Sequence, residues 1–286
     1  MKISLKIFLA TLLAILTFGN IIRSEVRYHC DSEKEHITKL IEASSKGENI
    51  GERVLLAAKS LIGTPIGPVA DNDSVGTIKV RLDSLDRASF IDMSIAAAQA
   101  SLMTSPSIKD FENKLEGVSR RKGKDEGFPS QFHYVSDWIV DNVYRGNVKE
   151  MTEYLESGNY KTKTLDRVSR NKEQYPALKD SSVLDRIKVI EMGFRSHRIP
   201  HLKKQSVGNK ALQQHFQNGD IIILLPPDPD YDVYDMGIVE VKDGVPYLIH
   251  PSMQSGSIIE DEYPLQRLFK LEGQYFYGFR WLRPVE

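Results

Sequence analysis

Residues 85–92 have the form of a helix start at which a nucleophile could be activated. A polar beginning leads into an apolar run with helical spacing: Phe90, Ile91, Ile95, Ala98 and Leu102. The N-terminus of a helix lowers the pKa of a thiol placed there, which makes the thiol a better nucleophile. The chain instead has Arg87, whose guanidinium stays protonated, and its single cysteine, Cys30, lies far upstream. The stretch therefore offers a position for nucleophilic catalysis without the nucleophile.

A second group of candidate residues has the side-chain types that recognise sugars and peptides. It combines hydrogen-bond donors, acceptors and aromatic faces within nine residues: Ser130, His133, Tyr134, Asp137 and Trp138. An aromatic-rich loop that packs for stability has the same composition. Ligand binding and packing therefore both remain open for this run.

The acidic segment 228–232 contains three alternating aspartates, which raises the question of a calcium loop. Such a loop beginning at Asp228 requires glycine at position 233 and glutamate at position 239, where the chain has Val233 and Val239. His197 and His201 have no acidic or thiol partner near them in sequence, so there is no zinc pattern. The sequence predicts no metal site and no cofactor.

Residues 1–24 have the features of a secretory signal peptide. Lys2 and Lys6 give a positive start, and the apolar stretch 7–18 is shorter than the roughly 20 residues that a membrane-spanning helix needs. We expect cleavage after Ser24, with cleavage after Gly19 and an uncleaved anchor as the alternatives. The mature protein, residues 25–286, would then have no membrane span.

The charge and the cysteine content exclude several classes of protein. Removing residues 1–24 takes away three of the 38 basic residues and none of the 39 acidic ones, which leaves a net charge of −4. A nucleic-acid binder has a basic surface instead, so no nucleic-acid partner is expected. A lone cysteine forms no internal disulfide, and Cys30 follows Arg27-Tyr28-His29 rather than the small residues of a lipoprotein cleavage site.

The hydrophobic periodicity changes along the chain from helical to strand-like. Helices are predicted at 33–45, 53–61, 86–103 and 186–194, and a short helical or turn segment at 138–143. Strands are predicted at 78–82, 220–225, 236–241, 247–250, 257–259 and 278–282, with a hairpin turn at Asp243-Gly244. Helices followed by antiparallel strands predict an α+β fold, with a helical first half packed on a mostly antiparallel β-sheet. The length allows one domain over 25–286 or two small ones, and we expect one.

Eight segments, in order, carry a resemblance to a known family. They lie at 61–65, 81–86, 127–134, 136–139, 173–178, 218–222, 236–239 and 248–252, and include Gly-Phe-Pro-Ser, Asn-Gly-Asp-Ile-Ile and Met-Gly-Ile-Val. Over about residues 50–285 the chain resembles the NlpC/P60-related amidase-like proteins of the DUF1460 type, which are secreted bacterial proteins that act on muropeptides. The resemblance implies a papain-like fold.

The resemblance also implies an activity, hydrolysis of the amide that joins N-acetylmuramic acid to L-alanine. The mechanism would use thiolate attack, an imidazole base and a third group that orients the imidazole. The family pattern Asp-Cys-x-Thr-Phe aligns with Asp86-Arg87-Ala88-Ser89-Phe90, so Arg87 occupies the nucleophile position. Asp235 occupies the base position and His250 the orienting position. One of the three roles is therefore retained and two are replaced.

The replacement of both groups suggests an ion pair. A cation at a helix N-terminus opposes the helix dipole, so Arg87 needs an anion nearby. We expect Asp235 to be that anion, with the charged groups within about 6 Å of each other. The alternative is that Arg87 points into solvent at an inactive site. Ser89 should point roughly 200° away from Arg87 and is expected as a helix-start residue rather than a nucleophile.

These observations predict a secreted, catalytically degenerate relative of the amidases that binds a muropeptide or peptidoglycan fragment. Its location would be the periplasm or the exterior of a Gram-negative bacterium. One alternative is an active amidase or acyl hydrolase with relocated groups, using Asp235, His250 and a hydroxyl or water. Another is a protein-interaction module in the former cleft. An open groove lined by Tyr134, Asp137 and His250 would favour ligand binding. A groove filled by Arg87 and neighbouring side chains would favour a structural role or a protein partner.

Overall fold

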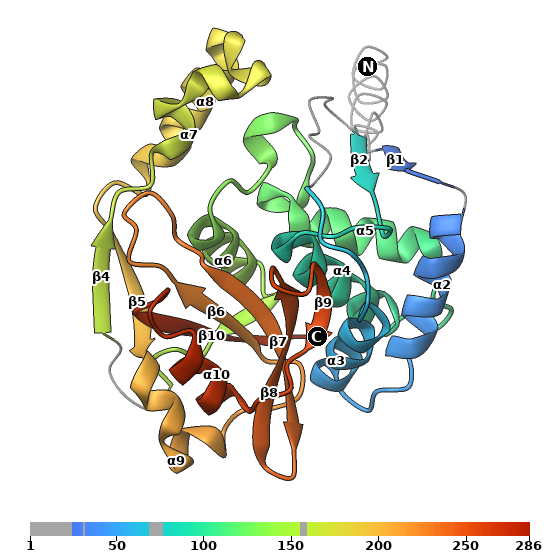
Figure 1. The fold of residues 1–286 in the computed structure, drawn as a ribbon. Coiled ribbons are helices and arrows are strands. Elements are labelled where there is room, and N and C mark those ends of the chain that lie inside the picture. The colour runs from blue at the N-terminus through green and yellow to red at the C-terminus, as the bar shows by residue number, and fades with distance from the viewer. Residues whose placement is uncertain (1–24, 31, 69–76, 155–158) are drawn as a thin grey trace, which may run out of the picture.

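The computed structural model describes residues 25–30, 32–68, 77–154 and 159–286, so the predicted signal peptide lies outside the described residues. The helices of the first half lie on one side of a central antiparallel sheet formed mainly by the second half (Figure 1). This is the α+β fold that the sequence predicts. None of the described helices is long and apolar enough to cross a membrane.

The first half forms a layer of helices around one central helix. The helices are α2 (Ser32–Ser44), α3 (Ile50–Ser60), α4 (Arg87–Ala100), α5 (Ile108–Ser119) and α6 (Val135–Tyr144). Helix α4 packs against α2, α3 and α5, and each of its residues from Phe90 to Ala100 is buried. Because α4 is enclosed on nearly every side, its position is fixed by packing along most of its length.

The sheet has the strand order β4-β5-β10-β6-β7-β8-β9, with β3 paired to β10, and all of these pairs are antiparallel. The strands are β3 (Val148–Glu150), β4 (Asn159–Lys163), β5 (His197–Lys203), β6 (Ile221–Leu225), β7 (Asp235–Lys242), β8 (Val245–Ser252), β9 (Ser257–Glu260) and β10 (Gly278–Pro284). All five residues of β6 are buried, so the centre of the sheet is covered on both faces. A separate parallel pair joins β1 (Glu25–Tyr28) to β2 (Thr77–Val80).

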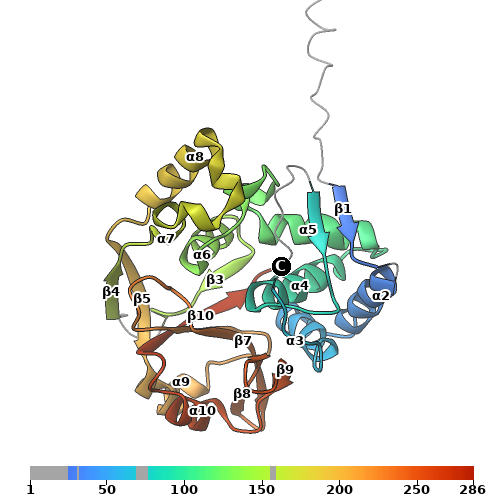
Figure 2. The same ribbon diagram turned by 45° about the horizontal axis from the view of Figure 1, so that its top comes forward.

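The two faces of the sheet have separate cores. Ile223 belongs to the core shared with α2–α5, whereas Ile222 belongs to the core on the opposite face, which α9 (Lys210–Gln213) and α10 (Leu265–Leu271) cover. A third apolar cluster lies around α7 (Arg167–Arg170) and α8 (Ser181–Met192), and both helices lie beside α6 in Figure 2.

Each predicted helix and strand occurs, with ends that shift by a few residues, but the sequence analysis missed others. Helix α5 begins with a capping box between Ser107 and Asp110, which was not recognised. Strand β5 contains Pro200, and a proline within a segment argues against predicting that segment as a strand from sequence. The structure tolerates this proline because β10 pairs only with Leu202 and Lys203, so Pro200 has a strand partner on the β4 side alone.

Gly237 permits the close approach of β7 and β8, which carry Asp235 and His250. A Cβ atom at Gly237 would lie 2.5 Å from the carbonyl oxygen of Ile249 and 2.8 Å from the Cβ atom of His250. We predict that Gly237→Ala lowers the free energy of unfolding by about 1–3 kcal/mol, because the backbone of β8 must move away. Chemical denaturation measures this change.

The control is Gly117→Ala in α5, where an added Cβ atom would meet nothing within 4 Å. Alanine favours a helix over glycine by up to about 1 kcal/mol, so this variant should be as stable as the native protein or more stable. Equal denaturation midpoints for the two variants would contradict the importance of the close approach at Gly237.

Candidate active site and the adjacent cavity

The first turn of α4 is held in place by its cap and by a link to the sheet. The Asp86 side chain accepts a hydrogen bond from the backbone N–H of Ser89 at 2.7 Å, which caps the helix. The backbone N–H of Leu85 donates to the Pro65 carbonyl at 2.9 Å, and that of Gly63 donates to the Ile258 carbonyl of β9 at 2.8 Å. The start of α4 therefore has a fixed position relative to the strands at the edge of the sheet.

Arg87 and Asp235 form the ion pair that the sequence suggests. The Arg87 Nε atom donates to Asp235 Oδ1 at 2.9 Å. The side chain of Asp235 is only 7% exposed and that of Arg87 is 34% exposed. The alternative in which Arg87 merely points into solvent is therefore wrong.

His250 binds the other oxygen of Asp235. Its Nδ1 atom lies 2.6 Å from Asp235 Oδ2, and its Nε2 atom lies 3.6 Å from Asp261 Oδ2. Burial by itself lowers the pKa of His250, but the hydrogen bond to Asp235 and the negative charges of the two aspartates raise the pKa to about 9. The imidazole is therefore protonated at neutral pH, and a protonated imidazole cannot act as a general base.

A row of alternating charges thus lies where the resemblance places the catalytic groups. The row consists of Arg87, Asp235, His250 and Asp261. The row contains no thiol, and its two cations are each paired with a carboxylate. The row is a buried ion-pair network that joins α4, β7 and β8.

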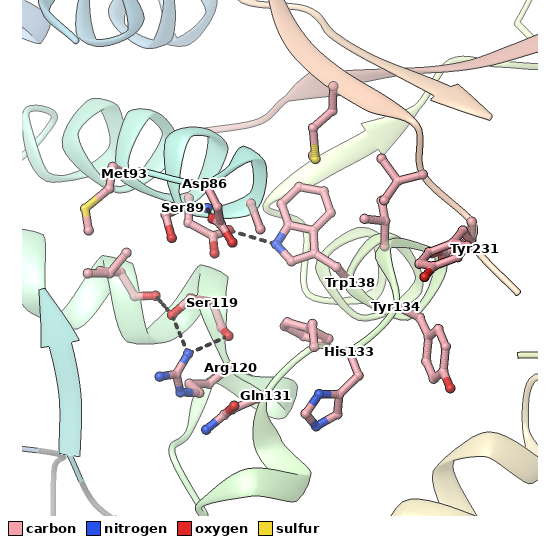
Figure 3. A pocket seen from close by; sticks show the side chains of 18 of the residues that line it. Asp86, Ser89, Met93, Ser119, Arg120, Gln131, His133, Tyr134, Trp138 and Tyr231 are labelled. Carbon is pink, nitrogen blue, oxygen red and sulfur yellow. Dashed lines mark hydrogen bonds between the residues drawn. The ribbon is translucent and has the colours of Figure 1, made fainter. Parts of the chain in front are cut away.

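A cavity of about 350 Å³ lies beside the same turn of α4. Asp86, Ala88 and Ser89 line it, whereas Arg87, Asp235 and His250 do not. Figure 3 shows Asp86, Ser89 and Met93 on one side of the cavity and Tyr134 and Tyr231 on the other. Ser89 and Arg87 therefore lie on different faces of α4, in agreement with the rotation of roughly 200° that the helix spacing predicts.

Three of the five residues expected to bind a ligand line this cavity, namely His133, Tyr134 and Trp138. Ser130 is instead buried in a turn, where its hydroxyl donates to the Gly127 carbonyl at 2.6 Å and accepts from the Glu126 N–H at 2.8 Å. Asp137 is buried in an ion pair with Arg121. Tyr134, Asp137 and His250 therefore do not line one groove together, which is the arrangement that would have favoured ligand binding.

The three lining residues use their polar atoms on protein partners. His133 Nε2 lies 3.0 Å from the Phe128 carbonyl, and burial lowers the pKa of His133 to about 4, so the neutral ring donates from this nitrogen. The Tyr134 hydroxyl donates to Glu191 at 2.7 Å, and Trp138 Nε1 donates to Asp92 at 2.9 Å. These residues therefore offer the cavity mainly their ring surfaces.

The sequence analysis missed Asp92, Arg167 and Tyr231, which also line the cavity. Asp92 is a carboxylate inside the apolar run of α4, and a charged residue among buried apolar ones could have identified it as a candidate site residue. Burial raises the pKa of Asp92 to about 7. Arg167 and Tyr231 lie in segments far apart in sequence, so no local pattern could have joined them.

The aspartates of segment 228–232 have partners within the protein. Asp228 accepts from the Asp230 N–H at 2.8 Å, Asp230 forms an ion pair with Arg170, and Asp232 accepts from the Ser136 N–H at 2.6 Å. Among the described residues, no group of three or more histidine, cysteine or acidic side chains could hold a metal ion.

The raised pKa of His250 predicts a pH-dependent stability. A histidine whose pKa is higher in the folded state stabilises the fold fully below its unfolded pKa, and that stability is lost as the pH rises through the folded pKa. For His250 the loss should fall between pH 6.5 and about 9. It should amount to about 3 kcal/mol in the free energy of unfolding, measured by denaturation at a series of pH values.

In His250→Gln this contribution should disappear, so the difference in stability between the native protein and the variant should shrink over that pH range. His36→Gln, an exposed change on α2, is the control and should leave the pH dependence unchanged. A stability difference between native protein and His250→Gln that stays constant from pH 6 to pH 9.5 would show that His250 is not held protonated by its aspartates.

Comparison with known proteins identifies the family. A model of AmiA-like proteins, described as N-acetylmuramoyl-L-alanine amidase-like, matches residues 59–272. An N-acetylmuramoyl-L-alanine amidase from Bacteroides uniformis ATCC 8492 has a similar structure, with a TM-score of 0.74 and 23% identity over 83% of this chain and 99% of that one. A DUF1460 protein from Legionella pneumophila is similar with a TM-score of 0.69 and 14% identity, over 90% and 95% of the two chains.

No curated protein sequence matches the chain. At these identities the two structures show a shared fold, while the family match spans most of the chain and includes Arg87, Asp235 and His250. The amidase-like resemblance seen in the sequence is thereby confirmed. The chain belongs to the AmiA-like family of N-acetylmuramoyl-L-alanine amidase-like proteins.

Proposed function

We propose that this protein is a non-hydrolytic member of its family, which binds muropeptides in the cavity beside α4. The observation that carries the proposal is the pairing of Arg87 with Asp235, next to a cavity that remains available. The resemblance to NlpC/P60 enzymes places the nucleophile at Arg87 and the base at Asp235. Thiol chemistry needs a thiolate and a neutral imidazole, and these two residues supply neither.

The size and lining of the cavity suit part of a muropeptide. Its volume of about 350 Å³ lies within the range of small-molecule sites, which begins at roughly 300 Å³. Phe132, Trp138 and Tyr231 give it aromatic surfaces, and charged side chains lie between them. Such surfaces stack on sugar rings and aliphatic side chains, while the charged groups orient a peptide. The signal-like residues 1–24 support a location outside the cytoplasm, where muropeptides occur.

One observation favours a second candidate, a hydrolase with relocated groups. Ser89 and Asp92 both line the cavity, three residues apart on α4, a spacing that places them on neighbouring parts of one helix face. The pKa of Asp92, raised to about 7 by burial, suits a general base at neutral pH. In this candidate the Ser89 hydroxyl would be the attacking group.

Mass spectrometry of defined muropeptides incubated with the protein separates the two candidates. We predict that the native protein releases no L-alanyl peptide. Arg87→Cys/Asp235→His restores a thiol and an imidazole at the two positions, and it should release the peptide from a ligand that extends past Ala88 on the cavity wall to position 87. Arg87→Ala/Asp235→Ala is the matched control, which removes the ion pair without adding the chemistry.

Cleavage by the native protein would contradict the leading proposal. In that event Ser89→Ala and Asp92→Asn should each abolish cleavage if the second candidate is correct. Cleavage that survives both substitutions would exclude this second candidate as well.

Binding has its own readout, because the chain has two tryptophans and only one of them, Trp138, lines the cavity. Trp281 is fully buried in the core on the opposite face of the sheet. In Trp281→Phe, muropeptide should shift the fluorescence emission of Trp138 in a saturable way. In the control Trp138→Phe, the emission of Trp281 should stay unchanged. An unchanged Trp138 spectrum together with no heat in calorimetry would exclude binding in this cavity.

A further inference from the structure

We propose that Arg167 and Tyr231 form a subsite for one carboxylate group in the peptide part of the ligand. This inference rests on the proposed function, because it names the chemistry that one end of the same cavity recognises. Both residues line the cavity, Arg167 from α7 and Tyr231 from the loop before β7. The Arg167 guanidinium carbon lies 4.6 Å from the centre of the Tyr231 ring.

The charge of Arg167 is available, whereas that of its neighbour is not. Arg170 pairs with Asp166 at 3.6 Å and with Asp230. For Arg167 the described part of the chain provides no hydrogen bond or ion pair to the guanidinium, only the face of Tyr231. Of the two acidic neighbours of Tyr231, Asp230 pairs with Arg170 and Asp232 accepts a hydrogen bond from the Ser136 N–H. Neither of them pairs with the Arg167 guanidinium in the described part of the chain.

The backbone beside Arg167 is anchored from behind. The Val168 N–H donates to the Tyr134 hydroxyl at 3.0 Å and to Glu191 Oε1 at 3.1 Å, and the Ser169 N–H donates to the same oxygen at 3.1 Å. Glu191 and Tyr134 are both buried. These contacts fix the turn that carries Arg167 without using its guanidinium.

The loop that carries Tyr231 is anchored in the same manner. The buried ammonium of Lys163 donates to the carbonyls of Pro226 at 2.8 Å, Asp228 at 2.6 Å and Tyr231 at 2.6 Å. Asp232 accepts the Ser136 N–H, which ties the other end of the loop to α6. Two independent sets of contacts therefore pre-organise the pair, and pre-organisation reduces the entropy lost when a ligand binds.

The chemistry of the pair selects a carboxylate. The planar guanidinium donates two parallel hydrogen bonds to a carboxylate, and the Tyr231 ring beneath it holds that plane. Asp230 and Asp232 also line the cavity, and although each has a partner, their negative charge disfavours a group with two charges. A single carboxylate therefore fits better than a phosphate.

Calorimetry with two matched ligands tests the subsite: N-acetylmuramoyl-L-alanyl-D-glutamate and the same compound with both glutamate carboxyl groups amidated. The native full-length protein should bind the acid about 10-fold or more tightly than the diamide, as expected for a charge-assisted pair. Arg167→Gln should weaken binding of the acid by about 10-fold and leave the diamide unchanged. Arg167→Lys should recover part of the preference for the acid over the diamide, because lysine keeps the positive charge but cannot donate two parallel hydrogen bonds.

Arg186→Gln is the control, since Arg186 on α8 is an exposed arginine that pairs with Glu126 away from the cavity. It should bind both ligands as the native protein does. Equal binding of the two ligands by the native protein, or an equal loss for both in Arg167→Gln, would overturn the subsite and leave the proposed function standing. Binding of neither ligand by the native protein would overturn the proposed function, and the subsite with it.

Discussion

The buried carboxylate of Asp235 constrains the whole region around it. A buried charge without a partner destabilises a fold by several kcal/mol, so this carboxylate requires cations. Arg87 binds one oxygen and His250 the other, which joins α4, β7 and β8 at one point. A thiolate on α4 and an imidazolium on β7 would meet the same requirement with the charges exchanged. We infer that this equivalence allows Arg87 and Asp235 to replace such a pair together, whereas either replacement alone would leave an unbalanced charge.

The geometry of α4 separates the ion-pair network from the cavity. Successive residues of a helix are rotated by about 100°, so Arg87 reaches Asp235 while Ala88 and Ser89 lie on the cavity wall. A change of side chain at position 87 therefore alters the chemistry and leaves the neighbouring surface in place. This separation supports the proposal that the cavity binds a ligand without the family's nucleophile.

The fold and the Arg87–Asp235 ion pair were predictable from the sequence, whereas much of the cavity was not. The helices and strands follow from hydrophobic periodicity. The helix start requires an anion beside Arg87, and the family resemblance identifies Asp235 as that anion. Ser130 and Asp137 were predicted as ligand-binding residues because they lie in a polar, aromatic run. The sequence of such a run does not show whether its polar groups bind a ligand or bind one another. Arg167 and Tyr231 meet only through the folding of α7 against the loop before β7, and no local spacing encodes that contact.

The charges along the cavity give it a direction. At the α4 end, the pKa of about 7 leaves Asp92 uncharged in roughly half of the molecules at neutral pH. His133 Nε2 and Trp138 Nε1 bind protein partners. The other polar residues that line this region are Lys79, Asp86, Ser89, Ser119, Arg120 and Gln131. At the α7 end, the Arg167 guanidinium lies against the Tyr231 ring and has no hydrogen-bond or ion-pair partner among the described residues. The proposed muropeptide would bind with its carboxylate toward α7. Its neutral part then lies beside the first turn of α4, where the family's reactive group is expected.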